Sequence, residues 1–245
     1  MDKEVKWFQE WFDTTYYHTL YKHRDDKEAQ LFIDNLLNLL KIPKNNICLD
    51  LACGKGRHAK YLSEKGLNVI GLDLSENSIK EAKKFESENL KFDTHDMREV
   101  YKENYFDCVF NLFTSFGYFD SNKDNIKVLT SIHQMLKKNG TLVIDFMNAE
   151  KVINNLVKQE VKTIDDIDFN ISRKFDGEHI FKNIRFNDKN EQFDFTERVQ
   201  ALRKNDFEEM LTATGFKINY TFGDFLLNEF NIEKSSRLII IASKL

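Results

Sequence analysis

One stretch, residues 47–58, limits the folds open to this chain more than any other part of the sequence. An apolar run at 47–51 gives way to a small-residue loop with Gly54 and Gly56, then to a helical pattern, and a second apolar run ends at Asp73. This order predicts a strand, a glycine loop, a helix and a second strand. Glycines let the backbone approach a ligand that a side chain would block, and a carboxylate at a strand end can accept hydrogen bonds from a ribose diol. We therefore predict that a ligand carrying adenosine binds here.

Three further residues indicate which adenosine ligand this is. The spacing of Gly54 and Gly56 also fits a dinucleotide site, so NAD is an alternative. Asp50 stands at the end of the first predicted strand, where a carboxylate would repel a pyrophosphate and attract the cationic groups of S-adenosylmethionine. Asp96 and Met97 follow the third apolar run and offer adenine an acceptor for its amine and a soft apolar surface. Together these residues favour S-adenosylmethionine over NAD.

At these positions the chain resembles the class I S-adenosylmethionine-dependent methyltransferases. The segments that carry the resemblance are 49–56, 71–75, 96–98, 106–111 and 136–144. It implies an enzyme that transfers a methyl group from S-adenosylmethionine. It also implies that the cofactor contacts come from Asp50, Ala52, Gly54, Gly56, Asp73, Leu74, Asp96, Met97 and Asn111.

The aromatic N-terminal segment is expected to cover the cofactor. Relatives use N-terminal tyrosine and arginine side chains for this, and Tyr17, Tyr21 and Arg24 are suitable by type. A phenol face can meet the sulfonium, and a guanidinium can pair with the methionine carboxylate. The alternative is a solvated amphipathic turn. His18 and His23 could act as a base, but we assign neither, so the catalytic residue is unknown.

Two short segments, 114–117 and 143–148, are similar to the glycine N-methyltransferase branch of the superfamily. This similarity implies that Asn148 helps to hold a small carboxylate substrate; the alternative is a turn residue that starts an insertion. The loop at 111–119 lacks the Asn/Asp-Pro-Pro-Tyr/Phe signature of enzymes that methylate nucleic-acid bases, so we do not expect DNA as a partner. We expect a small-molecule acceptor. An RNA or protein methyltransferase and a non-catalytic S-adenosylmethionine-binding protein remain alternatives.

The predicted fold class is α/β. We expect a Rossmann-like, doubly wound, mostly parallel seven-stranded sheet with an antiparallel terminal strand, a small inserted antiparallel β-sheet that acts as a lid, and N-terminal helices. Expected strands are 47–51, 68–73, 89–93, 106–111, 141–146, 216–222 and 237–242, and expected helices are 56–65, 76–85, 122–137 and 206–214. Two or three antiparallel strands are expected within 157–200. The predicted division is 1–42, a helical cap; 43–150 with 201–245, the methyltransferase core; and 151–200, the lid.

Composition limits the possible binding partners and cellular location. A net charge of −4 gives no overall basic field for nucleic acid or an anionic membrane. No apolar run approaches the ~18 residues of a spanning helix, and the sequence starts without a signal region, so we expect a cytoplasmic protein. The three cysteines lack metal-ligand spacing and indicate reduced core thiols, and no metal site is expected. The oligomeric state does not follow from the sequence.

Overall fold

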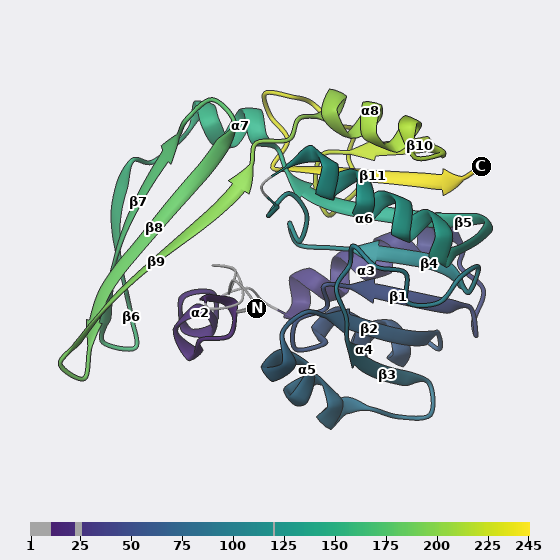
Figure 1. The fold of residues 1–245 in the computed structure, drawn as a ribbon, viewed down its shortest axis with the longest axis horizontal. Coiled ribbons are helices and arrows are strands. Elements are labelled where there is room, and N and C mark those ends of the chain that lie inside the picture. The colour runs from purple at the N-terminus through teal and green to yellow at the C-terminus, as the bar shows by residue number, and fades with distance from the viewer. Residues whose placement is uncertain (1–10, 23–25, 120) are drawn as a thin grey trace, which may run out of the picture.

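The computed structural model describes residues 11–22, 26–119 and 121–245, and a seven-stranded sheet forms its centre (Figure 1). The strands lie in the order β10-β11-β5-β4-β1-β2-β3. They are β1 (Ile47–Leu51), β2 (Asn68–Asp73), β3 (Leu90–Thr94), β4 (Phe106–Asn111), β5 (Leu136–Met147), β10 (Phe216–Phe222) and β11 (Arg237–Lys244). The pairs among β1 to β5 are parallel, whereas β11 runs antiparallel to β5 and β10. The predicted fold class is confirmed.

Helices cover both faces of this sheet. They are α3 (Asp26–Leu40), α4 (Arg57–Glu64), α5 (Glu76–Ala82), the 3₁₀ turn η1 (Lys83–Phe85), α6 (Asn122–Met135) and α8 (Lys204–Ala213). A further helix, α7 (Ala149–Asn154), packs with the insertion instead. Cys48 of β1 belongs to the apolar cluster under α3, α4 and α5, and its neighbour Leu49 belongs to the cluster under α6 and α8. Because both faces are covered, the central strands read as continuous apolar runs.

The chain reverses strand order beside β1. It proceeds from β1 to β2 and β3 on one side and then returns to β4 on the other side. In open α/β sheets a ligand binds beyond the carboxyl ends of the strands at such a switch point. The loops that follow β1, β2 and β4 therefore surround the expected site.

The insertion forms a separate antiparallel sheet of four strands, where we expected two or three. They are β6 (Gln159–Ile164), β7 (Ile167–Phe175), β8 (His179–Asp188) and β9 (Glu191–Gln200). β6 was missed because it is an edge strand whose residues alternate between exposed and half-buried, and this leaves only a weak apolar pattern. In Figure 1 this sheet extends from near α7 along one side of the core.

The N-terminal segment packs on the inserted sheet. Helix α2 (Thr15–Leu20) begins at Thr14, whose hydroxyl accepts the Tyr17 N–H, and it lies between the inserted sheet and the core (Figure 1). Trp11, 1% exposed, shares an apolar cluster with Phe169 and Phe186 of the insertion. Residues 1–10 and 23–25 lie outside the described residues. The division of the chain into cap, core and lid stays a prediction.

The largest difference from the expected boundaries lies at the start of β5. Helix α6 ends at Met135, and β5 starts at Leu136, five residues before the predicted strand. The helix ends where the Leu136 backbone becomes extended, with φ −72° and ψ 141°. Over the ranges that the structure describes, no helix is both long and apolar enough to cross a membrane.

Candidate active site

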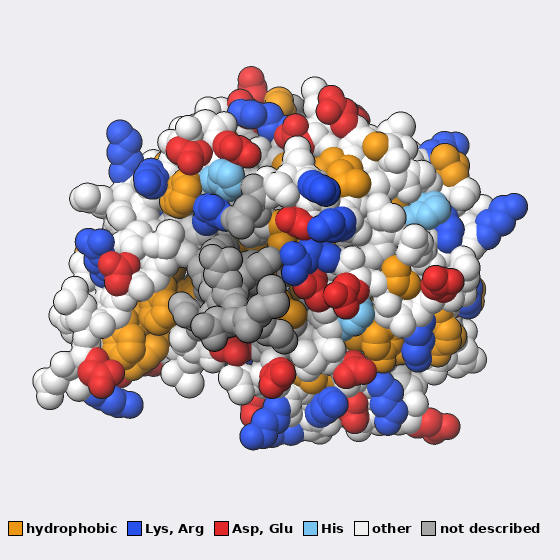
Figure 2. Space-filling model, in the orientation of Figure 1, with side chains coloured by type: hydrophobic (Ala, Val, Ile, Leu, Met, Phe, Trp, Pro, Cys, Tyr) orange, Lys and Arg blue, Asp and Glu red, His pale blue; other side chains and the backbone are white. Residues whose placement is uncertain are grey.

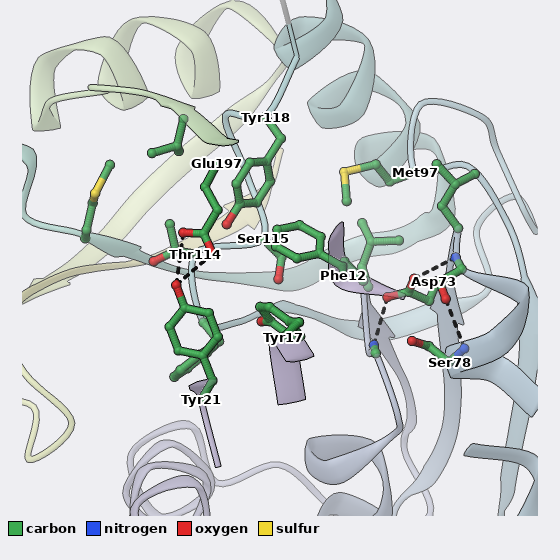
Figure 3. A pocket seen from close by; sticks show the side chains of 18 of the residues that line it. Phe12, Tyr17, Tyr21, Asp73, Ser78, Met97, Thr114, Ser115, Tyr118 and Glu197 are labelled. Atoms are coloured by element: carbon green, nitrogen blue, oxygen red, sulfur yellow. Dashed lines mark hydrogen bonds between the residues drawn. The ribbon is translucent and has the colours of Figure 1, made fainter. Parts of the chain in front are cut away.

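A cavity of about 400 Å³ lies at the switch point. Its walls come from the loops after β1, β2, β3 and β4, from α2, and from β7, β8 and β9 of the insertion. Figure 3 places Asp73 and Met97 at one end and Tyr21 and Glu197 at the other, with Phe12 and Tyr17 between them. We call the first the cofactor end and the second the acceptor end.

Asp73, at the last position of β2, organises the cofactor end. One carboxylate oxygen accepts the Gly54 N–H at 2.8 Å and the other accepts the Ser75 N–H at 2.8 Å. Burial raises the pKa of this carboxyl, and the hydrogen bonds from Ser75 and Gly54 oppose that rise. Each carboxylate oxygen can accept a second hydrogen bond. Asp73 therefore fixes the glycine loop and still has acceptor capacity directed into the cavity.

The two loop glycines have different surroundings. Gly54 has φ +56°, lines the cavity, and a Cβ built on it would meet nothing within 4 Å. Gly56 has φ +81°, but a Cβ there would lie 2.5 Å from the Phe92 ring. Gly54 thus borders open ligand space, whereas Gly56 is required for packing. Ala52, also in the cavity wall, holds a left-handed backbone with φ 62°.

The two residues predicted to contact adenine both lie in the cavity wall. Asp96 and Met97 line the cavity next to Leu74. The Asp96 carboxylate is held by the Arg98 side chain, with Nε 3.0 Å from Oδ1 and 3.1 Å from Oδ2. Met97 is anchored through its carbonyl, which accepts the Ser131 hydroxyl at 2.6 Å.

Three predicted cofactor residues lie behind the cavity wall. Asp50, 1% exposed, accepts the Ala59 N–H at 3.0 Å. Burial is the main cause that raises the pKa of Asp50 to about 7. Asn111 is fully buried and donates to the Leu51 carbonyl at 3.0 Å, and Gly56 packs on Phe92 as described above. Direct contact between these residues and the cofactor stays a prediction, and the structure gives each a supporting role in the loop after β1.

Two further predicted residues do not join the described site. Arg24 lies outside the described residues. Asn148 is 3% exposed and caps α7. Its amide nitrogen donates to the carbonyls of Ile232 and Ser235 at 2.8 and 2.9 Å. It is not among the cavity-lining residues, so these contacts support the alternative that Asn148 starts the insertion, and its substrate role remains only a prediction.

The turn after β4 has an unusual backbone. Phe113 and Thr114, both non-glycine, follow each other with φ 67° and 61°. Such residues cost of order 1–3 kcal/mol each and persist where the surroundings hold them. Asp145 of β5 provides this restraint: its carboxylate accepts the Phe113 N–H at 2.8 Å, and its carbonyl accepts the Thr114 N–H at 2.9 Å. Phe113 and Thr114 both line the cavity.

A polar cluster that the sequence did not predict forms the acceptor end. Glu197 of β9 accepts the Trp11 indole N–H at 2.7 Å and the Tyr21 hydroxyl at 2.7 and 2.9 Å. Lys182 of β8 lies directly across the strand pair from Glu197. Its Nζ donates to the Tyr21 hydroxyl and lies 3.7 Å from the Glu197 carboxylate. Only the cross-strand register and the docking of α2 bring these residues together, and no sequence motif signals either.

Tyr17, Tyr21 and His18 place the N-terminal segment in the cavity wall. The Tyr17 ring packs edge-on against Phe12 and at a tilt against Tyr21, with centroid distances of 4.9 Å each. Tyr21 reaches the acceptor end, so any cofactor contact of this residue stays a prediction. Burial and then the nearby Lys55 charge lower the pKa of His18, which favours the neutral imidazole.

The cofactor end suits S-adenosylmethionine. Asp73 offers acceptors for a ribose diol, Gly54 leaves open space, and Asp96 with Met97 provides an acceptor and a soft surface for adenine. Within the described ranges, no group of three or more His, Cys, Asp or Glu residues is placed to hold a metal ion.

Comparison with known proteins identifies the family. Residues 49–144 match the sequence family described as Methyltransferase domain. The chain is also 29% identical over 213 residues to YqeM of Bacillus subtilis (strain 168), whose name describes it as a methyltransferase. The match covers 83% of this chain and 86% of that one. The chain belongs to the class I S-adenosylmethionine-dependent methyltransferases. Its cofactor is S-adenosylmethionine.

Two other relatives of this methyltransferase are informative. A glycine/sarcosine/dimethylglycine N-methyltransferase of Actinopolyspora halophila is 28% identical over 217 residues, which cover 84% of this chain but 36% of that protein. The crystal structure of an S-adenosylmethionine-dependent methyltransferase from Clostridium acetobutylicum aligns with a TM-score of 0.79 at 20% identity, covering 94% of this chain and 96% of that one. The second likeness supports the fold, including the inserted sheet within the aligned length.

Proposed function

We propose that this methyltransferase transfers its methyl group to a small-molecule acceptor held at the acceptor end of the cavity. The observation that carries the proposal is the enclosure of that end by α2, the inserted sheet and the turn after β4. The whole cavity, cofactor end included, has a volume of about 400 Å³, within the roughly 300–1,000 Å³ of small-ligand pockets. The cofactor would fill part of this volume, and the space left at the acceptor end suits a metabolite better than a polymer segment.

The reaction we propose is an in-line displacement. When bound, the cofactor supplies a methyl group that its sulfonium charge already activates. The chain positions the acceptor and excludes water. Asp73 and the loop around Gly54 would hold the cofactor, while Glu197, Tyr21 and Lys182 would surround the acceptor. A base is required only for a protonated or weakly nucleophilic acceptor, and we assign none.

The charge distribution supports this acceptor class over RNA. Figure 2 shows Lys and Arg side chains mixed with Asp and Glu over the visible face, without a continuous basic track. Four basic residues of the insertion are paired with carboxylates: Lys162 and Arg173 with Glu160, Lys182 with Glu197, and Arg185 with Asp194. Polymer backbone binding needs clustered cations that remain available.

Nitrogen is the acceptor atom we favour, because the Actinopolyspora halophila relative is named an N-methyltransferase. We also propose a cytoplasmic location. The support is that three buried cysteines, Cys48, Cys53 and Cys108, form no disulfide, which suits a reducing compartment.

A screen with methyl-labelled S-adenosylmethionine tests the proposal. We expect label transfer to at least one small amine and none to total RNA or to denatured protein. The Asp73→Ala variant, impaired in cofactor binding, serves as the negative control. Transfer to RNA or protein alone would replace our proposal, and cofactor binding without transfer to any acceptor would favour the non-catalytic alternative.

A further inference from the structure

We propose that Arg237 and Thr114 form a subsite for an oxyanion of the acceptor, a carboxylate or a phosphate. This inference rests on the proposed function and deepens it, since it names the chemical class of the small molecule. Arg237 is the first residue of β11, and Thr114 belongs to the turn after β4. Both side chains line the cavity.

Arg237 is fixed from behind by a buried carboxylate. Its Nε donates to Asp145 Oδ1 at 2.7 Å, and Asp145 is 1% exposed. Its Nη2 donates to the Thr114 hydroxyl at 2.9 Å. The face of the guanidinium also lies 5.6 Å from the centre of the Phe225 ring. These contacts hold the side chain in one orientation, and such preorganisation lowers the entropy cost of binding a ligand.

The other edge of the guanidinium has donors to spare. Arginine carries five N–H groups. Among the described residues, Nη1 of Arg237 has no hydrogen-bond partner, and the contacts above involve Nε and Nη2. A guanidinium edge is matched in geometry to a carboxylate or a phosphate. The ligand that completes this side chain is therefore an oxyanion.

The strained turn is built around this subsite. Asp145 holds Phe113 through its carboxylate and Thr114 through its carbonyl, and the same carboxylate holds Arg237. One buried side chain thus ties two consecutive left-handed residues to the arginine. Backbone strain of this kind concentrates at ligand-binding positions. The restraint places the Thr114 hydroxyl beside the guanidinium, where it can donate its own hydrogen to the same anion.

The charges of the cavity wall agree with an anionic ligand. At the acceptor end three cations line the cavity, Arg173, Lys182 and Arg237, against one carboxylate, Glu197. The carboxylates that balance Arg173 and Arg237 are not lining residues. Asn148, which we expected to meet a carboxylate, has its amide committed to backbone carbonyls. In our proposal Arg237, and not Asn148, binds the carboxylate or phosphate of the acceptor.

Matched acceptor pairs test the subsite with the full chain. Each pair keeps the amine and removes the anion: glycine against glycinamide, and 2-aminoethyl phosphate against ethanolamine. We expect methylation of at least one anionic member with a kcat/KM at least about 100-fold above that of its neutral partner. The first pair reports a carboxylate and the second a phosphate. Equal rates for both members of every methylated pair would overturn the subsite while leaving the small-molecule proposal intact. Transfer to none of the four compounds would also overturn it, and the wider screen above then decides the proposed function separately.

Variants locate the effect. Arg237→Gln leaves Asp145 buried without its partner, which endangers folding, so Asp145→Asn/Arg237→Gln is tested beside it. We expect the folded variant to lose the anion preference while the dissociation constant for S-adenosylmethionine, measured by calorimetry, stays within about twofold. Arg185→Gln is the matched control, because Arg185 is exposed and outside the cavity wall. An unchanged anion preference in the double variant contradicts the proposal. A tenfold loss of cofactor affinity with that preference intact would assign Arg237 to the cofactor.

Discussion

Asp73, which we predict to bind the ribose, also holds two loops of the fold together. It closes the loop after β1 through the Gly54 N–H and the start of α5 through the Ser75 N–H. Ser75 in turn caps α5 by accepting the Ser78 N–H at 2.9 Å, and its hydroxyl also donates to Asp13 of the N-terminal segment. Cofactor recognition is therefore coupled to the conformation of two loops and the N-terminal segment.

Replacing Asp73 by alanine should weaken S-adenosylmethionine binding by at least about tenfold. The expected loss is roughly 1.5–3 kcal/mol for each charge-assisted hydrogen bond to the ribose. Calorimetry measures the dissociation constant, and circular dichroism checks that the variant is folded. An affinity within twofold of the original protein would place the cofactor elsewhere.

Gly54→Ala and Gly56→Ala form a matched pair. Both residues have positive φ, which costs an L-residue roughly 1–2 kcal/mol. At Gly54 the methyl group enters open ligand space, so we expect lost cofactor binding with a small drop in melting temperature. At Gly56 it meets Phe92 at 2.5 Å, so we expect a much larger drop. Equal drops in melting temperature, with cofactor affinity retained in Gly54→Ala, would show that Gly54 does not border the cofactor.

The raised pKa of Asp50 gives the stability a pH dependence. The carboxyl has a pKa of about 7 in the folded chain against an ordinary value of 3.8, so the folded state binds a proton that the unfolded state releases. The free energy of unfolding therefore falls as pH rises from about 4 to about 7, by at most about 1.4 kcal/mol per pH unit. Asp50→Asn should lack this dependence. Denaturant unfolding of both proteins from pH 5 to 8 should show Asp50→Asn gaining stability relative to the original protein as pH rises, and a constant difference would contradict the assignment.

At the scale of elements, the N-terminal segment and the inserted sheet act as one unit. Trp11 lies 4.6 Å from Phe195 between ring centroids, and Tyr16 lies 4.6 Å from Phe186. The Tyr16 hydroxyl also donates to Asp188 at 2.8 Å. The inner face of the insertion is buried because α2 covers it, so neither element should be ordered without the other.

Trp11→Ala should therefore release the inserted sheet from its cover. Removing a buried tryptophan costs about 3–5 kcal/mol, and here the hydrogen bond to Glu197 is lost as well. We expect faster amide hydrogen exchange in β7, β8 and β9 and little change in β1 and β4. Phe85→Ala, which removes an aromatic that is 45% exposed on the core, is the control. Unchanged exchange in the insertion would show that it stands without α2.

Sequence reasoning worked where a local pattern decides the structure. Strands at 47–51, 68–73 and 106–111 coincide with prediction because apolar runs there end at loops of polar or small residues. It failed for β6, which has little to bury, and for the end of α6, where an apolar helix residue and an apolar strand residue adjoin. The acceptor end could not be predicted, because the contact between Glu197 and Tyr21 depends on strand register and long-range packing.

At the scale of the whole molecule, the cavity joins parts of the chain that are far apart in sequence. The cofactor end belongs to the core, and the acceptor end draws on α2, the insertion and β11. Ligands that fill the cavity therefore contact the core, α2 and the insertion. Binding should reduce the mobility of all three.

Binding of S-adenosylhomocysteine should slow amide exchange in 11–22 and in β7 to β9, as well as in the glycine loop. The reason is that all these segments line one cavity, so a bound ligand restrains each of them. Strand β10, which contributes no lining residue, is the internal reference. Slower exchange confined to the glycine loop and Asp73 would mean that α2 and the insertion do not close over the cofactor, and they would then more naturally form a surface for a partner.

The apolar cluster of α2 and the inserted sheet is separate from the two clusters that sandwich the central sheet. Glu197, Lys182 and Tyr21 of the acceptor end thus rest on a small core of their own, whereas Arg237 and Thr114 are held by the central sheet. Substitutions in β7 to β9 can reshape that end without disturbing the packing that holds Asp73 and Gly54. Such an arrangement makes acceptor preference readily evolvable: the chain can be selected for a new substrate in one module while cofactor use is inherited unchanged in the other.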